Sequence, residues 1–323
     1  MTKIYIFISI IAMAMTACGG KSATNDSTDA SADTQPSVTV PEFNADSAYQ
    51  MVKHQCDMGP RVPGTAAHKQ CVEWITRQLS AWCDTVFAQT AQVTTFDNTR
   101  LNMTNLVGVI NPLAEQRLLV LAHYDCRPWA DEDEEPAKQQ QPVMGANDAA
   151  SGAAVLLELA RVMAEKKPEI GVDLLFVDVE DWGEDDNEDS WALGTQYWAQ
   201  HPHVSGYSPA FGILLDMVGA RGATFSPEAF SWQYAQSAVN LVWDTAKRAG
   251  FSNYFVMRTE APGITDDHMP INKAGIPCID IIDTRGEGGF FDGWHTTHDT
   301  LDNIDPATLK AVGQTLCHLI YNF

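Results

Sequence analysis

Acidic residues gather directly behind an apolar segment near the middle of this 323-residue chain. Residues 172–179 are mostly apolar and β-branched, as is typical of a strand buried on both faces, and Glu180 and Asp181 follow at once. Carboxylates this close together repel one another and resist transfer out of water, so such an arrangement usually serves a cation or a proton transfer. A solvated loop explains the outer acids at 185–189 well. A metal is the natural candidate for the inner pair.

Histidine and acidic side chains also stand at or near the ends of other apolar segments. They are His123, Asp125, Asp148, Asp216, His268 and His295. Any one of them alone is more often a helix cap, a core histidine or a solvated acid, and Asp148 lies where it can cap the following helix. Together they form a mixed set of imidazoles and carboxylates, which suits zinc. Three such ligands with one open position make a catalytic site.

The elements that must position these residues alternate between strands and helices. Hydrophobic periodicity predicts helices over 45–57, 66–83, 150–166, 190–200, 227–249 and 306–319, and strands over 86–96, 104–110, 118–122, 172–179, 211–215, 254–257 and 277–282. The pattern, which has no internal repeat, predicts one α/β domain with three α/β/α layers around a central mixed, twisted sheet. Ligand sites of such sheets lie beyond the carboxyl ends of the strands, so the scattered acids and histidines can converge.

The N-terminus predicts export. Residues 1–17 contain a basic residue and an apolar run too short to span a membrane comfortably, and Cys18 follows. This end resembles the bacterial lipoprotein signal, in which the cysteine is lipidated; plain cleavage after Ala17 is the alternative. Residues 18–42 are small and polar and predict a disordered tether, which leaves a zinc-dependent catalytic domain at 43–323. We expect an exported bacterial lipoprotein, membrane-anchored through Cys18, in the periplasm or at the cell surface.

The composition limits the partners. A formal charge of -22 and an isoelectric point near 4.5 argue against nucleic acid or an anionic membrane surface, because both would be repelled. A neutral or cationic partner, such as a peptide amino terminus, is compatible with this charge. Six cysteines remain besides Cys18, without a CxxC pair, so a redox or zinc-finger site is disfavoured and their disulfide pairing stays open. We expect a monomer.

Several motifs carry a resemblance to a known family. The segments HYD, GANDAASG, VEDWG, LLDMVG and HTTHDTLDNI resemble the M28 zinc-peptidase superfamily over nearly all of residues 45–323. Four further features are similar to its glutaminyl-peptide cyclotransferase (glutaminyl cyclase) branch, in a bacterial form. They are RVPGT at 61–65, SWALGTQYWA at 190–199, TDDHMP at 265–270, and Trp294 directly before His295. The resemblance implies a zinc-aminopeptidase-like (phosphorylase/hydrolase-like) fold.

When residues are matched by position to the motifs of this family, the resemblance also implies which of them bind the metal. One zinc ion would be bound by Asp148, Asp181 and His295. Asp181 departs from the glutamate that is common at its position in the family. Because one methylene is lost, the strand end or the zinc must lie slightly closer to the other ligands.

The resemblance further implies the residues that act on the substrate. Glu180 would be the acid/base, and Asp216 and Asp266 would form a supporting carboxylate network, while Trp294 and Ile264 would wall the glutaminyl pocket. Trp191 and Phe291 are further candidates for apolar walls that exclude water. Core packing is the alternative for Trp191.

The implied reaction fits these residue types. Cyclising an N-terminal glutamine requires a polarised γ-carbonyl, an α-amine free of its proton, and protonation of the departing ammonia. Zinc can supply the Lewis acid. Glu180, if its pKa is raised, can take the amine proton and return it to the leaving nitrogen. The expected substrates are peptides or proteins with N-terminal glutamine.

Two other functions remain open from the sequence. A dinuclear zinc aminopeptidase would hold a second ion with His123, Asp125 behind it, and Asp216; Asp148 would bridge the two ions and Glu180 would activate a water. From a different class, the chain would be a non-catalytic surface lipoprotein that binds peptides. The intact acid/base and ligand set argues against this second alternative.

Overall fold

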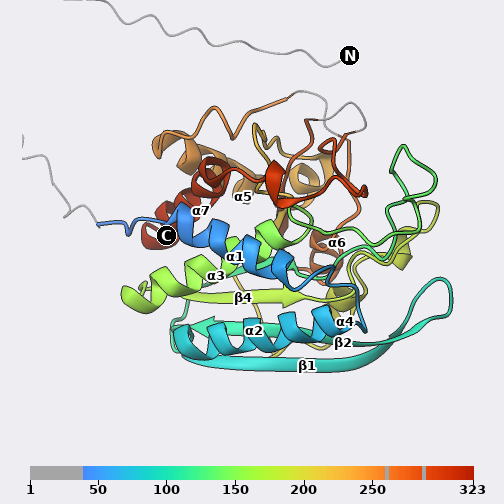
Figure 1. The fold of residues 1–323 in the computed structure, drawn as a ribbon. Helices are drawn as coiled ribbons and strands as arrows, with labels where there is room; N and C mark the ends of the chain where they lie inside the picture. The colour runs from blue at the N-terminus through green and yellow to red at the C-terminus, as the bar shows by residue number, and fades with distance from the viewer. Residues whose placement is uncertain (1–38, 259–261, 286–288) are drawn as a thin grey trace, which may run out of the picture. The chain divides into compact units, whose positions relative to one another are not determined.

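The computed structural model describes residues 39–258, 262–285 and 289–323 (Figure 1). The predicted signal peptide, the lipidation site Cys18 and most of the tether lie outside these residues and stay predictions. The last tether residues, 39–42, contact the domain, since the Pro41 carbonyl accepts a hydrogen bond from Gln314 at 3.0 Å. Phe43 is fully buried, and its amide donates to Gln314 Oε1 at 2.8 Å. The packed chain therefore begins a few residues before the predicted domain boundary.

A six-stranded mixed sheet forms the centre of the domain. Its strands are β1 (Thr85–Thr94), β2 (Arg100–Ile110), β3 (Arg117–His123), β4 (Gly171–Val177), β5 (Gly212–Asp216) and β6 (Cys278–Ile282), in the spatial order β1-β2-β4-β3-β5-β6. β3 to β6 run parallel, whereas β2 is antiparallel to both β1 and β4. β1, at the edge, alternates exposed and half-buried residues, and the central β4 is buried throughout. The alternating pattern of β1 suits an edge strand, and the fully apolar β4 suits the centre of the sheet.

Five helices cover one face of the sheet. They are α1 (Ala45–Asp57), α2 (Ala66–Trp82), α3 (Ala150–Glu165), α5 (Ala229–Arg248) and α7 (Pro306–Tyr321). Their bounds agree with the predicted ones to within two residues. The side chains of Asn44, Thr65 and Asp305 each accept a first-turn amide hydrogen bond, so three of these helices begin at residues whose capping role is visible in the sequence.

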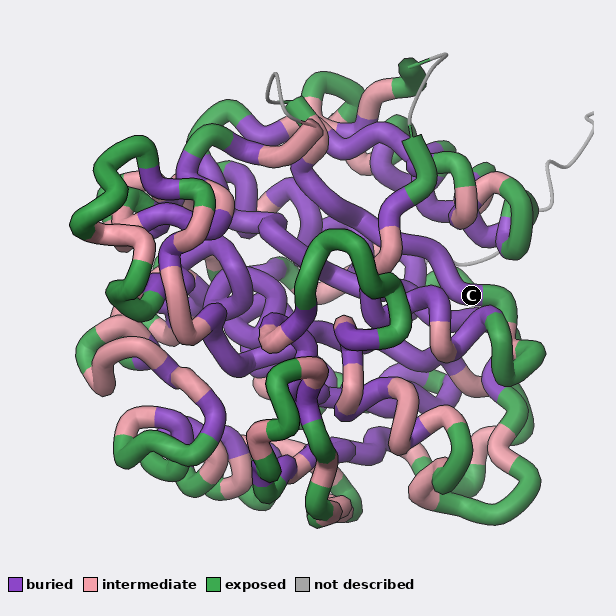
Figure 2. Tube along the Cα trace, turned by 90° about the vertical axis from the view of Figure 1, so that its right-hand side faces the viewer, coloured by how far each residue is buried: buried purple, intermediate pink, exposed green. Residues whose placement is uncertain are grey.

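Two short helices, α4 (Leu193–Gln200) and α6 (His268–Lys273), cover the opposite face. Alternate residues of β3 show the two layers: Leu118 and Val120 belong to the core under the five helices, and Leu119 and Leu121 belong to the core under α4 and α6. Figure 2 shows the buried residues gathered in the interior and the exposed ones on the surrounding loops. The predicted three-layer α/β/α fold is confirmed.

One local prediction is wrong. Residues 254–257 form no strand; Phe255 makes only an isolated bridge with Phe225 and packs its ring edge-on against Trp243 of α5, at 5.4 Å between centroids. The TDDHMP motif at 265–270 contains the start of α6. Pro270 lies in the first turn of that helix, where a missing amide has no intrahelical partner to lose, so it does not prevent the helix.

The six cysteines of the described ranges are all free thiols. They are Cys56, Cys71, Cys83, Cys126, Cys278 and Cys317.

In the described part of the chain, every helix is too short or too polar to cross a membrane.

Candidate active site

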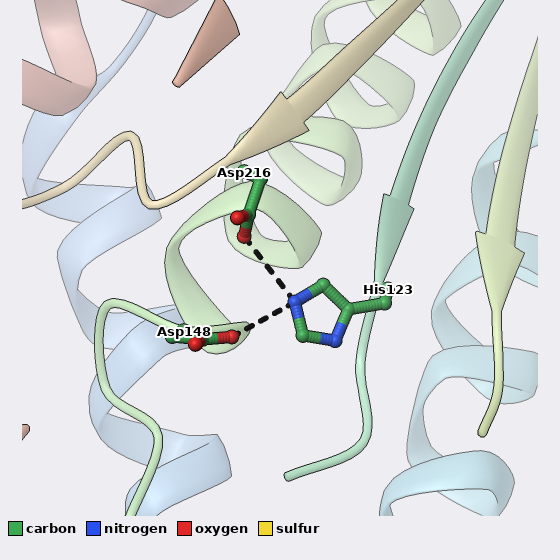
Figure 3. A group of neighbouring side chains, drawn as sticks. All are labelled: His123, Asp148 and Asp216. Carbon is green, nitrogen blue, oxygen red and sulfur yellow. Dashed lines mark hydrogen bonds and ion pairs between the residues drawn. The ribbon is translucent and has the colours of Figure 1, made fainter. Parts of the chain in front are cut away.

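The parallel strands bring the predicted site residues to one edge of the sheet. β3 ends at His123, β5 ends at Asp216, and the chain leaving β4 reaches Glu180 and Asp181 directly afterwards. Asp148 comes from the loop that precedes α3. In Figure 3 one ring nitrogen of His123 points toward the carboxylates of both Asp148 and Asp216. The strand directions therefore assemble residues that are far apart in the sequence.

His123 is the centre of a first cluster of acids. Its Nε2 lies 2.9 Å from Asp148 Oδ1 and 3.2 Å from Asp216 Oδ1. Its Nδ1 faces Asp125 Oδ1 at 3.6 Å and Glu180 Oε2 at 3.8 Å. Burial lowers the pKa of His123, but hydrogen bonds to Asp125, Asp148 and Asp216 outweigh burial and hold this pKa well above its ordinary value. The surrounding acids therefore stabilise the protonated form of His123.

A second cluster consists of Asp148, Asp181 and His295. His295 Nε2 lies 3.2 Å from Asp181 Oδ1 and 3.9 Å from Asp148 Oδ2, and one ligand atom from each residue lies within 4.8 Å of the others. Asp181 Oδ2 is buried without a hydrogen-bond partner among the described residues, which is costly for a carboxylate unless it binds a cation. Two carboxylates and one imidazole at this spacing are a donor set that fits zinc.

Two side chains of the site, those of Glu180 and His295, are positioned by strained backbone. Val179, directly before Glu180, has a φ of 53°, and His295 has a φ of 52°, in a left-handed region that is rare outside glycine. Asp125 stabilises the backbone that follows Val179, because its carboxylate accepts hydrogen bonds from the amides of Glu180 at 3.2 Å and Asp181 at 3.3 Å. Such strain, about 1–3 kcal/mol per residue, persists where the surroundings over-determine the conformation, and it is common at functional sites.

Asp299 supports the loop that carries Asp148, and the sequence analysis missed it. Its Oδ1 accepts the amide of Asn147 at 2.8 Å, and its Oδ2 accepts the amide of Asp148 at 3.0 Å. Asn147 in turn accepts the amide of Gly219 at 2.8 Å. Burial raises the pKa of Asp299 to about 8, and the charge of Asp148 contributes to this shift. The only signal in the sequence is its place close behind His295 in HTTHD.

Arg127 is a second residue that the sequence analysis missed. It is buried, and its guanidinium lies 3.4 Å from Asp181 Oδ1 and donates to Asp131 Oδ1 at 2.7 Å. Its Cζ lies 4.9 Å from the centroid of a Trp191 ring, and the His295 imidazole stacks on the same indole at 6.0 Å. Arg127 therefore orients both a candidate ligand and a cavity wall. Its position two residues after the HYD motif is its only signal in the sequence, and this signal does not reveal the contact with Asp181.

A cavity of about 320 Å³ opens onto these clusters. Its polar lining includes Asp148, Glu180, Asp216, Asp266 and His295, and its apolar walls include Trp191, Ile264, Phe290 and Trp294. Trp294 stacks on the His295 imidazole, with 3.7 Å between ring centroids. Phe291, which we expected in the wall, instead packs against Met217 and Ile282, and the neighbouring Phe290 lines the cavity.

His268 does not reach this cavity, contrary to our expectation. It is fully buried at the start of α6, where its Nε2 lies 3.4 Å from Glu228 Oε1. Asp266 lines the cavity, whereas the Asp267 carboxylate accepts the Thr195 hydroxyl hydrogen bond at 2.5 Å. Successive side chains at a helix start point about 100° apart, so adjacent residues of this motif face different surroundings.

The acids around the cavity hold their protons more strongly than ordinary carboxyls. Burial, together with the charges of Asp181, Asp266 and Asp267, raises the pKa of Glu180 well above its ordinary value. Burial and the charges of Asp216 and Asp267 do the same for the pKa of Asp266. Burial raises the pKa of Asp267 to about 7. A carboxyl group whose pKa is raised toward neutral can both give and take a proton, as a general acid/base must.

These raised pKa values predict that the metal-free protein loses stability as the pH rises. Glu180, Asp266 and Asp299 keep their protons in the folded state at pH values where the unfolded chain, with carboxyl pKa values near 4, has released them. The raised pKa of His123 acts in the same direction. We expect the melting temperature of chelated protein to fall between about pH 5 and 8.

Zinc requires deprotonated carboxylates, so its addition should raise the melting temperature most at the upper end of this pH range. Differential scanning fluorimetry with chelator and with zinc checks both statements. A melting temperature of the metal-free protein that rises from pH 5 to 8 would contradict the assignment of buried, protonated acids.

Comparison with known proteins extends the motif resemblance. A family model described as Peptidase family M28 matches residues 105–320. The chain is 25% identical over 293 residues to the glutaminyl-peptide cyclotransferase of Bos taurus, which covers 80% of this chain and 76% of that relative. The solved structure of Bacteroides thetaiotaomicron glutaminyl cyclase bound to N-acetylhistamine is 44% identical, with a TM-score of 0.86, and covers 88% of this chain and 100% of that one.

A structure described as a Zn-dependent exopeptidase from Parabacteroides distasonis has the same identity of 44%, the same TM-score of 0.86 and the same coverage of 88% and 100%. The region matched by the family model contains all the residues of both clusters, from His123 to His295. The family that we predicted from the motifs is thereby confirmed. The chain belongs to peptidase family M28 and, within that family, to the glutaminyl cyclases.

Proposed function

We propose that this protein converts the N-terminal glutamine of peptides or proteins into pyroglutamate and releases ammonia. The observation that carries the proposal is a single cavity that joins Asp148 and His295 of the second cluster to Glu180 and Asp266 beneath apolar walls. A glutamine side chain that folds back onto its own amine needs a polarising group, an acid/base and a wall that excludes water, all in one place. Similarity to a bacterial glutaminyl cyclase over that protein's full length supports the same reaction.

Asp148, Asp181 and His295 would hold one zinc ion. The unpartnered Asp181 Oδ2 and the close grouping of the three ligand atoms support this donor set. When bound, zinc supplies a Lewis acid that polarises the γ-carbonyl. Arg127 restrains Asp181 through its contact with Oδ1 at 3.4 Å, which leaves Oδ2 available to the ion.

Glu180 moves the proton. Ring closure forms a bond between the α-amine nitrogen and the carbonyl carbon of the side-chain amide (Cδ), and it breaks the bond between that carbon and the amide nitrogen, which leaves as ammonia. The Glu180 carboxylate accepts one proton from the attacking amine and returns it to the departing nitrogen, so no net proton is gained or lost. Burial and nearby acids raise the pKa of Glu180. A raised pKa makes it easier for the same carboxyl group both to accept a proton from the amine and to release it to the leaving nitrogen.

Asp266 and Asp216 orient the amide that leaves. Both line the cavity, and Asp266 Oδ2 is buried without a partner among the described residues. Burial and the charge of Asp216 keep a proton on Asp266 by raising its pKa. A protonated carboxyl group both donates and accepts hydrogen bonds, so Asp266 can bind the NH2 and the carbonyl side of the glutamine amide.

A dinuclear zinc aminopeptidase is the competing function, and one observation favours it. His123, Asp148 and Asp216 form a second group with the spacing of metal ligands, and this group shares Asp148 with the first. The cyclase is favoured because Trp294 and Asp266 line the cavity beside Glu180, and because the similarity to a bacterial glutaminyl cyclase covers that protein's full length.

Ammonia release and zinc content, measured on the same purified protein, test the proposal. We expect ammonia from a Gln-initiated peptide, one zinc ion per chain, and loss of both after chelation, with recovery when zinc is restored. Release of free leucine or alanine from peptide N-termini, with two zinc ions per chain, would establish the aminopeptidase instead. Tight peptide binding by metal-free protein without turnover would establish the non-catalytic alternative.

We also propose that the chain is exported and lipid-anchored through Cys18. The proposal is supported by the apolar run and small residues that precede this cysteine. The expected result is a lipid-sized mass on the mature N-terminus and membrane association that Cys18→Ala removes. An unmodified, freely released mature protein would overturn it.

A further inference from the structure

A second cavity of about 330 Å³ lies beside the catalytic one, between α4 and α6. Four residues line both cavities: Glu188, Trp191, Thr265 and Asp266. The two cavities are therefore neighbours that share one wall. The reaction proposed above uses only the first of them.

We propose that the second cavity binds the side chain of the residue that follows the glutamine, with a preference for lysine or arginine. This inference rests on the proposed cyclase function. Because the glutamine side chain and amine occupy the catalytic cavity, the rest of the peptide leads away from it. The shared wall places a second binding site within reach of the next residue.

The floor of the second cavity is apolar. Ala192 and Met269 are both buried, and Ala199 of α4 contributes a half-buried methyl group. The methylene stem of a long side chain can lie along such a floor while its polar end stays in water. The sulfur and methyl surface of a methionine adapts to stems of different length.

The rim of the second cavity is acidic. Lys273 Nζ lies 3.8 Å from Asp189 Oδ1, so these two exposed charges offset one another. Glu188 stands at the edge common to both cavities, and the exposed Asp185 lines the mouth of the first. The net charge of -22 gives the surrounding field the same sign. A cationic side-chain end is therefore attracted to this edge, and a carboxylate is repelled.

The shared wall is held in place, so the two cavities remain separate. Trp191 Nε1 donates to the Glu184 carbonyl at 3.1 Å, and Gln196 Nε2 donates to the Trp191 carbonyl at 2.8 Å. Arg127 stacks on the indole. Gly183 allows the ring to approach closely, because a Cβ there would lie 2.1 Å from it. A fixed partition lets the second cavity select one side chain without disturbing the glutamine.

The test fills the second cavity and compares substrates with and without a second residue. Ala199 lines only this cavity, and Ala199→Trp should occupy it. We expect kcat/KM for glutaminamide, which has no second residue, to change by less than about twofold. For a Gln-Lys peptide we expect a fall of roughly tenfold or more, since one methylene in a pocket is already worth about tenfold. Ala81→Trp on the exposed face of α2 is the matched control and should alter neither value.

The wild-type protein tests the charge preference. Gln-Lys should exceed Gln-Glu peptides in kcat/KM by roughly fivefold at low salt, and the ratio should shrink at high salt because exposed charges are screened. Lys273→Glu should increase the ratio. Equal rates for the two peptides, independent of salt, would overturn the charge preference.

Equal losses for glutaminamide and Gln-Lys in Ala199→Trp, or no loss for either, would overturn the second site. If Ala199→Trp does not fold, Ala274→Trp at the exposed end of α6 fills the same cavity from the other side. A wrong cyclase function would give a different result from a wrong second binding site. In that case the wild-type protein would release no ammonia from glutaminamide or from any Gln-initiated peptide.

Discussion

Glu180→Gln is expected to lower kcat for ammonia release by roughly 10²- to 10⁴-fold and to leave the zinc content unchanged. The glutamine side chain has nearly the same size and fills the same place in the cavity, but it cannot accept the amine proton. Glu180 is not one of the three residues in the second cluster, so the ion should remain bound. Steady-state kinetics and metal analysis of the same preparation check both halves of the prediction.

Glu73→Gln is the matched control for this variant. Glu73 is exposed on α2, far in the sequence from the site, and the same chemical change there should leave the rate within about twofold. A normal rate in Glu180→Gln would refute its role as the acid/base. Loss of zinc from this variant would show that Glu180 helps to bind the ion.

His295→Ala is expected to empty the zinc site and abolish turnover. The imidazole is the one nitrogen donor of the second cluster, with Nε2 at 3.2 Å from Asp181. Even residues that only support a ligand change metal affinity by about 10- to 100-fold, so removal of a ligand should cost more. Zinc titration with a competing chelator measures the affinity, and the ammonia assay measures the rate.

Two further variants test whether the zinc is lost because the His295 imidazole is missing. His298→Ala changes the exposed histidine of the same HTTH segment and should retain both zinc and activity. His295→Asn removes the imidazole but places at φ 52° a residue type that tolerates this conformation, so it separates the loss of the ligand from backbone strain. Undiminished zinc content in both His295 variants would remove His295 from the ligand set.

The chain's local patterns were enough to predict the architecture and the edge of the sheet that carries the site. Apolar segments of the length of strands alternate with helical ones, and β3 and β5 end in His123 and Asp216. Carboxyl ends of parallel strands meet at one edge, so residues at those ends converge wherever they stand in the chain. The same reasoning, together with the motifs, pointed to Asp148, Glu180 and Asp181, and the structure brings all five residues to that edge.

Which neighbouring side chain faces the cavity was decided by tertiary structure. Phe290 and Phe291 are adjacent and chemically alike, yet one lines the cavity and the other packs in a small core. His268 follows the cavity residue Asp266 closely but lies against Glu228. Periodicity assigns a face only within regular helices and strands, and these residues stand in loops or at a helix start.

The supporting residues were equally beyond the reach of the sequence. Asp299 holds the Asp148 loop through two backbone amides, and Arg127 reaches Asp181 from a loop that reads as acidic and solvated. Such contacts join segments far apart in the chain, and no local pattern encodes them. Sequence alone therefore determined the kind of chemistry and the elements that bear it. The orientation of each side chain came from loop backbone and long-range hydrogen bonds, which exist only once the chain is folded.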